Sequence, residues 1–149
     1  MKHFFVTILI AFFSSAAVAQ TNDPEAVKQV LNNYKKAIEK LDTNGVVTLF
    51  VKDSKVFEQA KDEGTIGHYL EHHLGPELKA FKSFTFSDYK VAVTVTGGYA
   101  FSTETYIYTI VLAKDGSNIK SQGVATSVLK KTKDGWKILQ THSSFRKAK

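Results

Sequence analysis

The sequence predicts an α+β fold in which helices pack on one face of a curved antiparallel sheet. Helical periodicity is confined to the first half of the chain. After Phe81, apolar and polar residues alternate with period two in segments rich in Val, Ile, Thr and Tyr. The connections between these later segments have the composition of hairpin turns. Helices followed by hairpin-connected strands indicate α+β rather than an alternating α/β arrangement.

Residues 1–19 have the pattern of a cleavable secretory signal peptide. A short basic start precedes an apolar run at 4–13, which cannot span a bilayer because a spanning helix needs about 20 apolar residues. Ala17-Val18-Ala19 matches the small-x-small pattern read by signal peptidase, so cleavage is expected before Gln20. We therefore expect a periplasmic or secreted protein with one domain, residues 20–149, and no membrane association after cleavage.

The composition narrows the function classes. The chain contains no cysteine, which excludes disulfides, thiolate metal sites and anchoring through an acylated cysteine. Its formal net charge is +6, but lysines scattered among acidic residues carry most of the positive charge, and Arg146 is the single arginine. Nucleic-acid grooves typically combine arginines with exposed aromatic rings, so we expect no nucleic-acid partner.

A long amphipathic helix is predicted to begin at Asp23-Pro24-Glu25, where Asp23 suits the N-cap and the proline suits the first turn. Apolar residues then recur three or four apart along one face: Val27, Val30, Leu31, Tyr34, Ile38 and Leu41. Asp42-Thr43-Asn44-Gly45 ends this helix. A short helical piece at 46–50 and a brief strand at 56–57 are expected next.

A further helical segment is predicted at 65–78, with Thr65 as its cap and an interruption at Gly75-Pro76. His73 lies on its apolar face, and an inward imidazole needs a polar partner inside the protein. His68 and His72 lie on the other face at i and i+4. No third ligand or metal-binding glutamate motif accompanies them, so no metal site is expected.

Four strands are predicted in the second half of the chain, at 89–95, 99–112, 120–131 and 136–145. Their connections contain the turn formers Gly97-Gly98, Asp115-Gly116 and Asp134-Gly135. Consecutive hairpins of this kind build an antiparallel meander.

The final strand carries a resemblance to a known family. With the capped helix, the interrupted helical segment and the meander, it resembles the nuclear transport factor 2-like superfamily, and within it the SnoaL-like or ketosteroid-isomerase-like proteins of bacteria. The segment concerned is Asp134-Gly135-Trp136-Lys137-Ile138-Leu139-Gln140-Thr141-His142-Ser143-Ser144. The resemblance implies a cone-shaped fold, with a long N-terminal helix and further short helices packed on a strongly curved antiparallel sheet. It also implies an apolar pocket inside the cone and a homodimer formed through the sheet.

The chain departs from many relatives at one point of this strand. They have two histidines at alternate positions, whereas Gln140 stands at the first position here and only His142 is present. The tyrosine and aspartates of ketosteroid isomerase cannot be placed on this sequence, so that activity is not carried over. Fold alone does not give function in this superfamily.

Alternation along the strands nominates residues for the pocket, because side chains repeat on one face every two residues. Trp136, Ile138, Gln140, His142 and Ser144 form one such set, and Ala100, Ser102, Glu104, Tyr106, Tyr108 and Ile110 form another. The candidate catalytic residues are His73, Glu104 and His142. The candidate ligand-binding residues are Glu58, Tyr69, Tyr106, Tyr108, Trp136, Gln140 and Ser144.

Structural roles compete with these assignments. Trp136 could simply fill the core, Tyr106 and Tyr108 could pair across strands on an outer or dimer-forming face, and His142 could hydrogen-bond a neighbouring carbonyl. Two functions therefore stay open. One is a binding module for a small apolar or aromatic molecule. The other is a cofactor-independent isomerase, dehydratase or cyclase that uses histidine and glutamate as acid and base.

Overall fold

The computed structural model describes residues 22–148, and the predicted signal peptide lies outside them. The helices are α1 (Asp23–Glu39), the 3₁₀ turn η1 (Val46–Leu49), α2 (Ile66–Tyr69), the π-helical turn η2 (Leu70–Leu74) and α3 (Gly75–Lys79). The strands are β1 (Phe50–Glu58), β2 (Lys61–Gly64), β3 (Phe81–Thr96), β4 (Tyr99–Leu112), β5 (Asn118–Thr132) and β6 (Gly135–Lys147). The predicted α+β architecture is confirmed.

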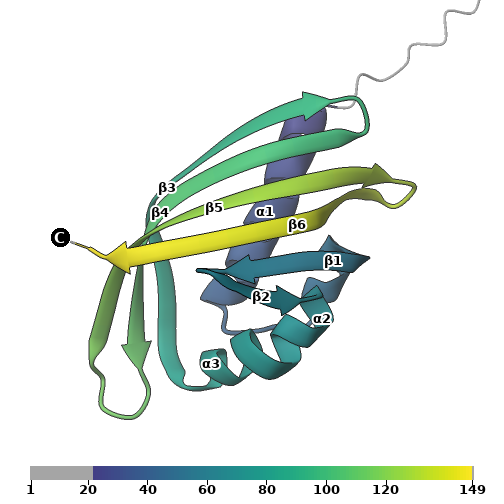
Figure 1. The fold of residues 1–149 in the computed structure, drawn as a ribbon. Coiled ribbons are helices and arrows are strands. Elements are labelled where there is room, and N and C mark those ends of the chain that lie inside the picture. Colours follow the sequence, from purple (N-terminus) through teal and green to yellow (C-terminus); the bar gives the residue numbers. More distant parts are fainter. Residues whose placement is uncertain (1–21, 149) are drawn as a thin grey trace, which may run out of the picture.

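The strands form one sheet in the order β2-β1-β6-β5-β4-β3. The pairs from β3 to β6 are antiparallel, as the meander predicts, whereas β1 runs parallel to β6. Figure 1 shows α1 behind the sheet and the helices α2 and α3 beside β1 and β2, so the curved sheet and the helices enclose a common interior. This arrangement is the cone expected from the sequence.

The N-cap of helix α1 lies one residue earlier than the sequence predicts. Asn22 occupies the N-cap position without a side-chain cap, and Asp23 is already helical. The Asp23 carboxylate instead accepts hydrogen bonds from the indole nitrogen of Trp136 (2.9 Å) and from Lys131 (2.8 Å). A capping preference depends on neighbouring residues only. Here the bonds to Trp136 and Lys131, from the far end of the chain, take the place of a cap. The expected cap at Thr65 is confirmed, since its hydroxyl accepts from the backbone N–H of His68.

The interruption predicted at Gly75-Pro76 takes an unexpected form. The chain does not leave the helix there, because α2, η2 and α3 follow one another without a break. The N–H of Gly75 donates to the carbonyl of Leu70, five residues back, which is the π-helical pattern. A β-carbon at position 75 would lie 2.3 Å from that oxygen, so glycine permits the turn.

Strand β3 is longer than predicted, because it begins at Phe81 rather than near Tyr89. Its pairing with β4 shifts between Ser87 and Lys90, where Asp88 has a positive φ of 51°. Such a bulge bends a strand and strengthens its twist. The bend lets Phe84 and Phe86, before it, and Tyr89, after it, face the same interior.

A second irregularity changes which face β6 presents. Ile138 pairs with Leu129 and Gln140 pairs with Val128, so Leu139 is an extra residue between them. Before this bulge, Trp136 and Ile138 are buried. After it, Thr141 is the buried residue and His142 is exposed. The prediction that Trp136, Ile138, Gln140, His142 and Ser144 share one face is therefore wrong from Gln140 onward.

The apolar core joins the helices to the inner face of the sheet. Val27 and Leu31 of α1 pack there with Leu129, Trp136 and Ile138 of the sheet, all of them buried. Trp136 is thus a core residue, the structural alternative that the sequence left open. Within residues 22–148 no helix has the length and apolar character needed to cross a bilayer.

Candidate functional site

The interior also holds a cavity of about 570 Å³. Helix α1 and the η2 turn form one side, and the inner faces of the strands form the other. The set predicted on β4 does face inward, since Ala100, Ser102, Glu104, Tyr108 and Ile110 are buried and Tyr106 lines the cavity. A volume of this size is typical of small-molecule sites, which run from about 300 to 1,000 Å³.

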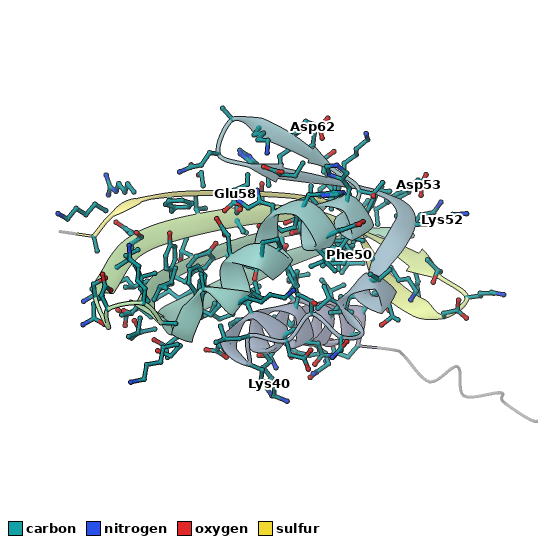
Figure 2. The ribbon with its side chains drawn as sticks, turned by 90° about the horizontal axis from the view of Figure 1, so that it is seen from below. Lys40, Phe50, Lys52, Asp53, Glu58 and Asp62 are labelled. Carbon is teal, nitrogen blue, oxygen red and sulfur yellow. The ribbon has the colours of Figure 1, made fainter. Side chains whose placement is uncertain are left out.

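One end of the cavity carries a group of ionisable side chains, named here the His73 cluster: Glu58, Glu63, His73 and Glu77. His73 Nδ1 lies 2.9 Å from Glu63 Oε1, and its Nε2 lies 3.2 Å from Glu77 Oε1 and 3.6 Å from Glu58 Oε2. One imidazole therefore faces three carboxylates. Figure 2 shows Glu58 between the strands and the helices, whereas Lys40, Lys52 and Asp53 project from the surface.

The π-helical turn gives His73 this position. Tyr69 and His73 lie one helical turn apart in the α2–α3 segment, with ring centroids 5.2 Å apart. The Tyr69 hydroxyl donates to Glu58 Oε2 at 2.8 Å, which connects the helix to the end of β1. Glu77 follows His73 by one turn and completes the cluster from the same side.

The cluster shifts the ionisation of its members. Burial works to raise the pKa of Glu63, but a hydrogen bond from Lys61 and the contact with His73 outweigh it and hold the pKa below its ordinary value. Burial works to lower the pKa of His73, but Glu63, Glu77 and Glu58 raise it above its ordinary value. Burial and the neighbouring charges of Glu58 and Glu63 raise the pKa of Glu77, although His73 opposes them. Both shifts favour a protonated His73 beside an ionised Glu63.

A second carboxyl lies away from this cluster, in the middle of β4. Glu104 is 8 % exposed, and its Oε2 accepts a hydrogen bond from the Tyr89 hydroxyl at 2.5 Å. Burial raises the pKa of Glu104, and the bond from Tyr89 only partly opposes this shift. Glu104 thus has the properties of a buried acid or base with a single neutral donor.

Aromatic side chains form much of the remaining wall. Burial, assisted by nearby carboxylates, raises the pKa of Tyr34, Tyr69, Tyr89 and Tyr106 above the ordinary value for a phenol. These hydroxyls consequently stay protonated and can act as hydrogen-bond donors at all physiological pH values. The ring centroid of Phe84 lies 4.9 Å from that of Phe86 and 5.2 Å from that of Tyr108. These contacts extend the apolar wall along β3 and β4.

The structure brings together six of the ten residues nominated from the sequence. The cavity is lined by His73, Glu104, Glu58, Tyr69, Tyr106 and Tyr108. It does not bring in His142, Gln140 or Ser144, because the bulge at Leu139 turns them to the outer face, nor Trp136, which belongs to the core. His142 donates from Nε2 to the backbone carbonyl of Gln59 at 2.7 Å. A site combining Glu104 with His142 is therefore excluded.

Several residues that line the cavity were not predicted from the sequence. Glu77 could have been found, because it follows His73 by four residues on the helical pattern. Tyr34 was placed on the apolar face of the long helix but was not considered for the pocket. Glu63 gave no signal, because the short strand β2 was not predicted. Phe84 and Phe86 alternate with polar residues, which would have indicated the missing half of β3.

Comparison with known proteins identifies the family. A family model described as a SnoaL-like domain matches residues 27–147. No curated protein sequence matches the chain. A candidate dehydratase of the nuclear transport factor 2-like family from Streptomyces avermitilis is 22 % identical, with a TM-score of 0.72 over 83 % of this chain and 97 % of that one. A candidate ketosteroid isomerase from Shewanella frigidimarina is 28 % identical, with a TM-score of 0.66 over 80 % and 94 %. The chain belongs to the SnoaL-like domain family and has the nuclear transport factor 2-like fold.

Proposed function

We propose that the protein binds a small, largely apolar or aromatic molecule in the cavity. The observation that carries this proposal is an interior space of about 570 Å³ walled by aromatic rings, with polar groups at a few fixed positions. Such a combination is typical of small-molecule sites, because the apolar wall supplies affinity and the polar groups supply orientation. Native mass spectrometry of the purified protein would detect a retained ligand.

A variant that fills the cavity tests this proposal directly. Ala125 lies on the inner face of β5 opposite Glu104, so Ala125→Trp places a large ring inside the cavity. Lys120→Trp adds the same ring on an exposed part of the same strand and serves as the control. Loss of binding of 1-naphthol, measured by calorimetry, in the first variant alone supports the proposal. Equal binding by both variants contradicts it.

A second candidate function is proton transfer next to a carbonyl group. The observation in its favour is Glu104, a buried carboxyl with a raised pKa beside phenol donors. Its carboxylate could remove a proton from carbon while a tyrosine hydroxyl donates a hydrogen bond to the developing enolate oxygen. Candidate isomerase and dehydratase relatives have the same fold. Turnover of a small ketone by the wild type but not by Glu104→Gln would establish this activity.

We also propose that the protein is a homodimer formed through the outer face of the sheet. Phe101 and Val124 are exposed there, on the neighbouring strands β4 and β5. An exposed apolar sheet face typically packs against a partner. Light scattering should give twice the chain mass, and Val124→Glu should give the monomer.

Export is proposed from the signal pattern alone. The mature protein should begin at Gln20 and appear in the periplasm or the medium. Mass determination of protein from each cell fraction would check both points, and a cytoplasmic protein that retains residues 1–19 would contradict them.

A further inference from the structure

The cavity is acidic although the protein is basic. The chain has 20 lysine and arginine residues against 14 aspartates and glutamates. Four of those 14 acidic side chains line this one cavity: Glu58, Glu63, Glu77 and Glu104. A concentration of like charges around a largely apolar space costs free energy unless opposite charge is supplied.

The positive side chains near the cavity compensate only part of the negative charge of these four glutamates. Lys61 pairs with Glu63 at 3.1 Å, but its side chain is 71 % exposed and lies at the rim. Lys35 pairs with Glu39 at 2.8 Å. His73 offers at most one positive charge to the three carboxylates of its cluster.

Three carboxyls are therefore left without a full counter-charge. Within residues 22–148, no lysine or arginine forms an ion pair with Glu58, Glu77 or Glu104. Glu58 and Glu77 share one nitrogen of His73, and Glu104 has only the neutral Tyr89 hydroxyl.

Glu58 and Glu104 face a common space. Burial raises the pKa of Tyr34 most, and Glu58, Tyr106 and Glu104 raise it further. Burial also raises the pKa of Tyr106 most, and Glu104, Tyr108 and Glu58 add to that shift. Both tyrosines line the cavity together with Glu58 and Glu104, so the two carboxyls and the phenol rings border the same space. A positive group placed there would meet carboxylate oxygens and aromatic faces together.

The wall already holds one such group. The ammonium of Lys35 lies 5.6 Å from the ring centroid of Phe86 and 5.5 Å from that of Tyr89, with Glu39 as its carboxylate partner. Aromatic faces attract cations through their negative quadrupole, and more strongly when water is excluded. Glu58 and Glu104 line the same cavity beside aromatic rings, but Lys35 pairs with Glu39 and forms no ion pair with either of them.

We propose that the cavity selects cationic ligands, molecules in which a primary or quaternary ammonium is attached to an aromatic or apolar body. The ammonium lies between Glu58 and Glu104, and the body lies along the wall of Phe84, Phe86 and Tyr108. An anionic ligand is disfavoured because every uncompensated charge in the cavity is negative. This inference rests on the proposed binding function and names the class of molecule that is bound.

Three indoles with short side chains of similar size and different charge test the proposal. Tryptamine is a cation, tryptophol is neutral and indole-3-acetate is an anion, and their binding is compared by calorimetry at neutral pH. We expect tryptamine to bind about tenfold more tightly than tryptophol, the factor expected for a partly desolvated cation over aromatic rings. Indole-3-acetate should bind most weakly of the three.

Charge-removing variants locate the ammonium. Glu58→Gln and Glu104→Gln should each lower the ratio of tryptamine to tryptophol affinity about threefold, since each removes one of the two charges that together favour the cation about tenfold. Glu71→Gln removes the same charge from an exposed position on the η2 turn and should leave the ratio unchanged. An equal effect of Glu71→Gln would overturn the assignment, because it would indicate an unspecific field.

The outcomes separate this inference from the function on which it rests. Tryptophol binding as tightly as tryptamine, or indole-3-acetate binding most tightly, overturns the cation preference and leaves the binding function standing. Failure of all three indoles to bind overturns both. If a variant does not fold, as judged by circular dichroism, the comparison of the three indoles on the wild type still decides.

Discussion

The ring of Tyr106 lies directly on the backbone of Gly123 in the neighbouring strand. The two residues are paired in register between β4 and β5, and a β-carbon at position 123 would lie 2.2 Å from Cε2 of the ring. Glycine is therefore required for the ring to lie flat on the sheet, where it forms part of the cavity floor. A side chain at this position would have to push the ring into the cavity.

Gly123→Ala is accordingly expected to lower the free energy of unfolding by about 1 to 3 kcal/mol, the usual range for overpacking a filled site. It should also weaken binding of 1-naphthol, because the displaced ring occupies part of the cavity. Gly98→Ala is the control, since a β-carbon there meets nothing within 4 Å. In the double variant with Tyr106→Ala, the added cost of Gly123→Ala should disappear. Simple additivity would show that the ring is not the cause.

Gly75→Ala should break the π-helical turn, because its β-carbon would collide with the Leu70 carbonyl. We expect a loss of about 2 kcal/mol in unfolding free energy, within the range for backbone strain. The contact between His73 and Glu63 should be lost as well, and the imidazole pKa would then return toward its ordinary value, as a proton NMR titration can measure. Gly67→Ala, in the same helical segment but with no close contact, should stabilise the helix by up to about 1 kcal/mol.

The helices and the meander were predictable because their periodicity extends over many residues. The sequence also placed His73 on the inward face of a helix, and alternation along its strand made Glu104 a candidate for the pocket. The orientation of β6 beyond Leu139 was not predictable. One extra residue moves every later side chain to the opposite face of the sheet. Residues 138–141 contain no glycine or proline that would indicate a bulge.

Contacts between distant segments were equally invisible. Asp23 was assigned to the N-cap, but it bonds Trp136, 113 residues away. Glu63 joined the site only because β2 pairs with β1 and turns its side chain toward His73. Such pairings depend on tertiary packing, which local propensity does not contain.

Asp23→Ala should destabilise the protein by about 2 kcal/mol, because it leaves the indole N–H of Trp136 without its acceptor in a largely buried site. Glu25→Ala is the matched control, since its ion pair with Lys28 lies at the exposed surface and contributes about 0.5 kcal/mol or less. Urea unfolding of both variants measures the difference. Equal losses would mean that the acidic start of α1 acts only through the helix dipole.

The ion pair of His73 and Glu63 should make stability depend on pH. The pKa of His73 is raised above its ordinary 6.5, so its contribution is present below that pH and is lost as the pH rises through the raised value. The pKa of Glu63 is lowered from 4.5, so its contribution is present above 4.5 and is lost as the pH falls through the lowered value. The pair therefore stabilises most between these ordinary values.

The test compares urea unfolding of the wild type and His73→Asn at about pH 5.5 and about pH 8.5. We expect the advantage of the wild type to shrink at the higher pH. Glu63→Gln should also lower the imidazole pKa of His73 in an NMR titration, because it removes the nearest carboxylate. An advantage that does not change with pH would refute the ion pair.

Glu104 should impose the opposite dependence, because its pKa is raised by burial. The folded protein then holds a proton that the unfolded chain releases near pH 4.5, so stability falls as the pH rises from there through the raised pKa. Above that window the fold contains a buried carboxylate with a single neutral donor. Glu104→Gln keeps an acceptor for Tyr89 and removes the charge, so it should raise the midpoint of thermal unfolding at neutral pH and give no gain near pH 4. The same variant should have a weaker preference for tryptamine, since a destabilising charge is retained where function needs it. A variant that gains no stability at neutral pH, while Glu71→Gln behaves identically, would show that the Glu104 charge is already compensated in the folded protein.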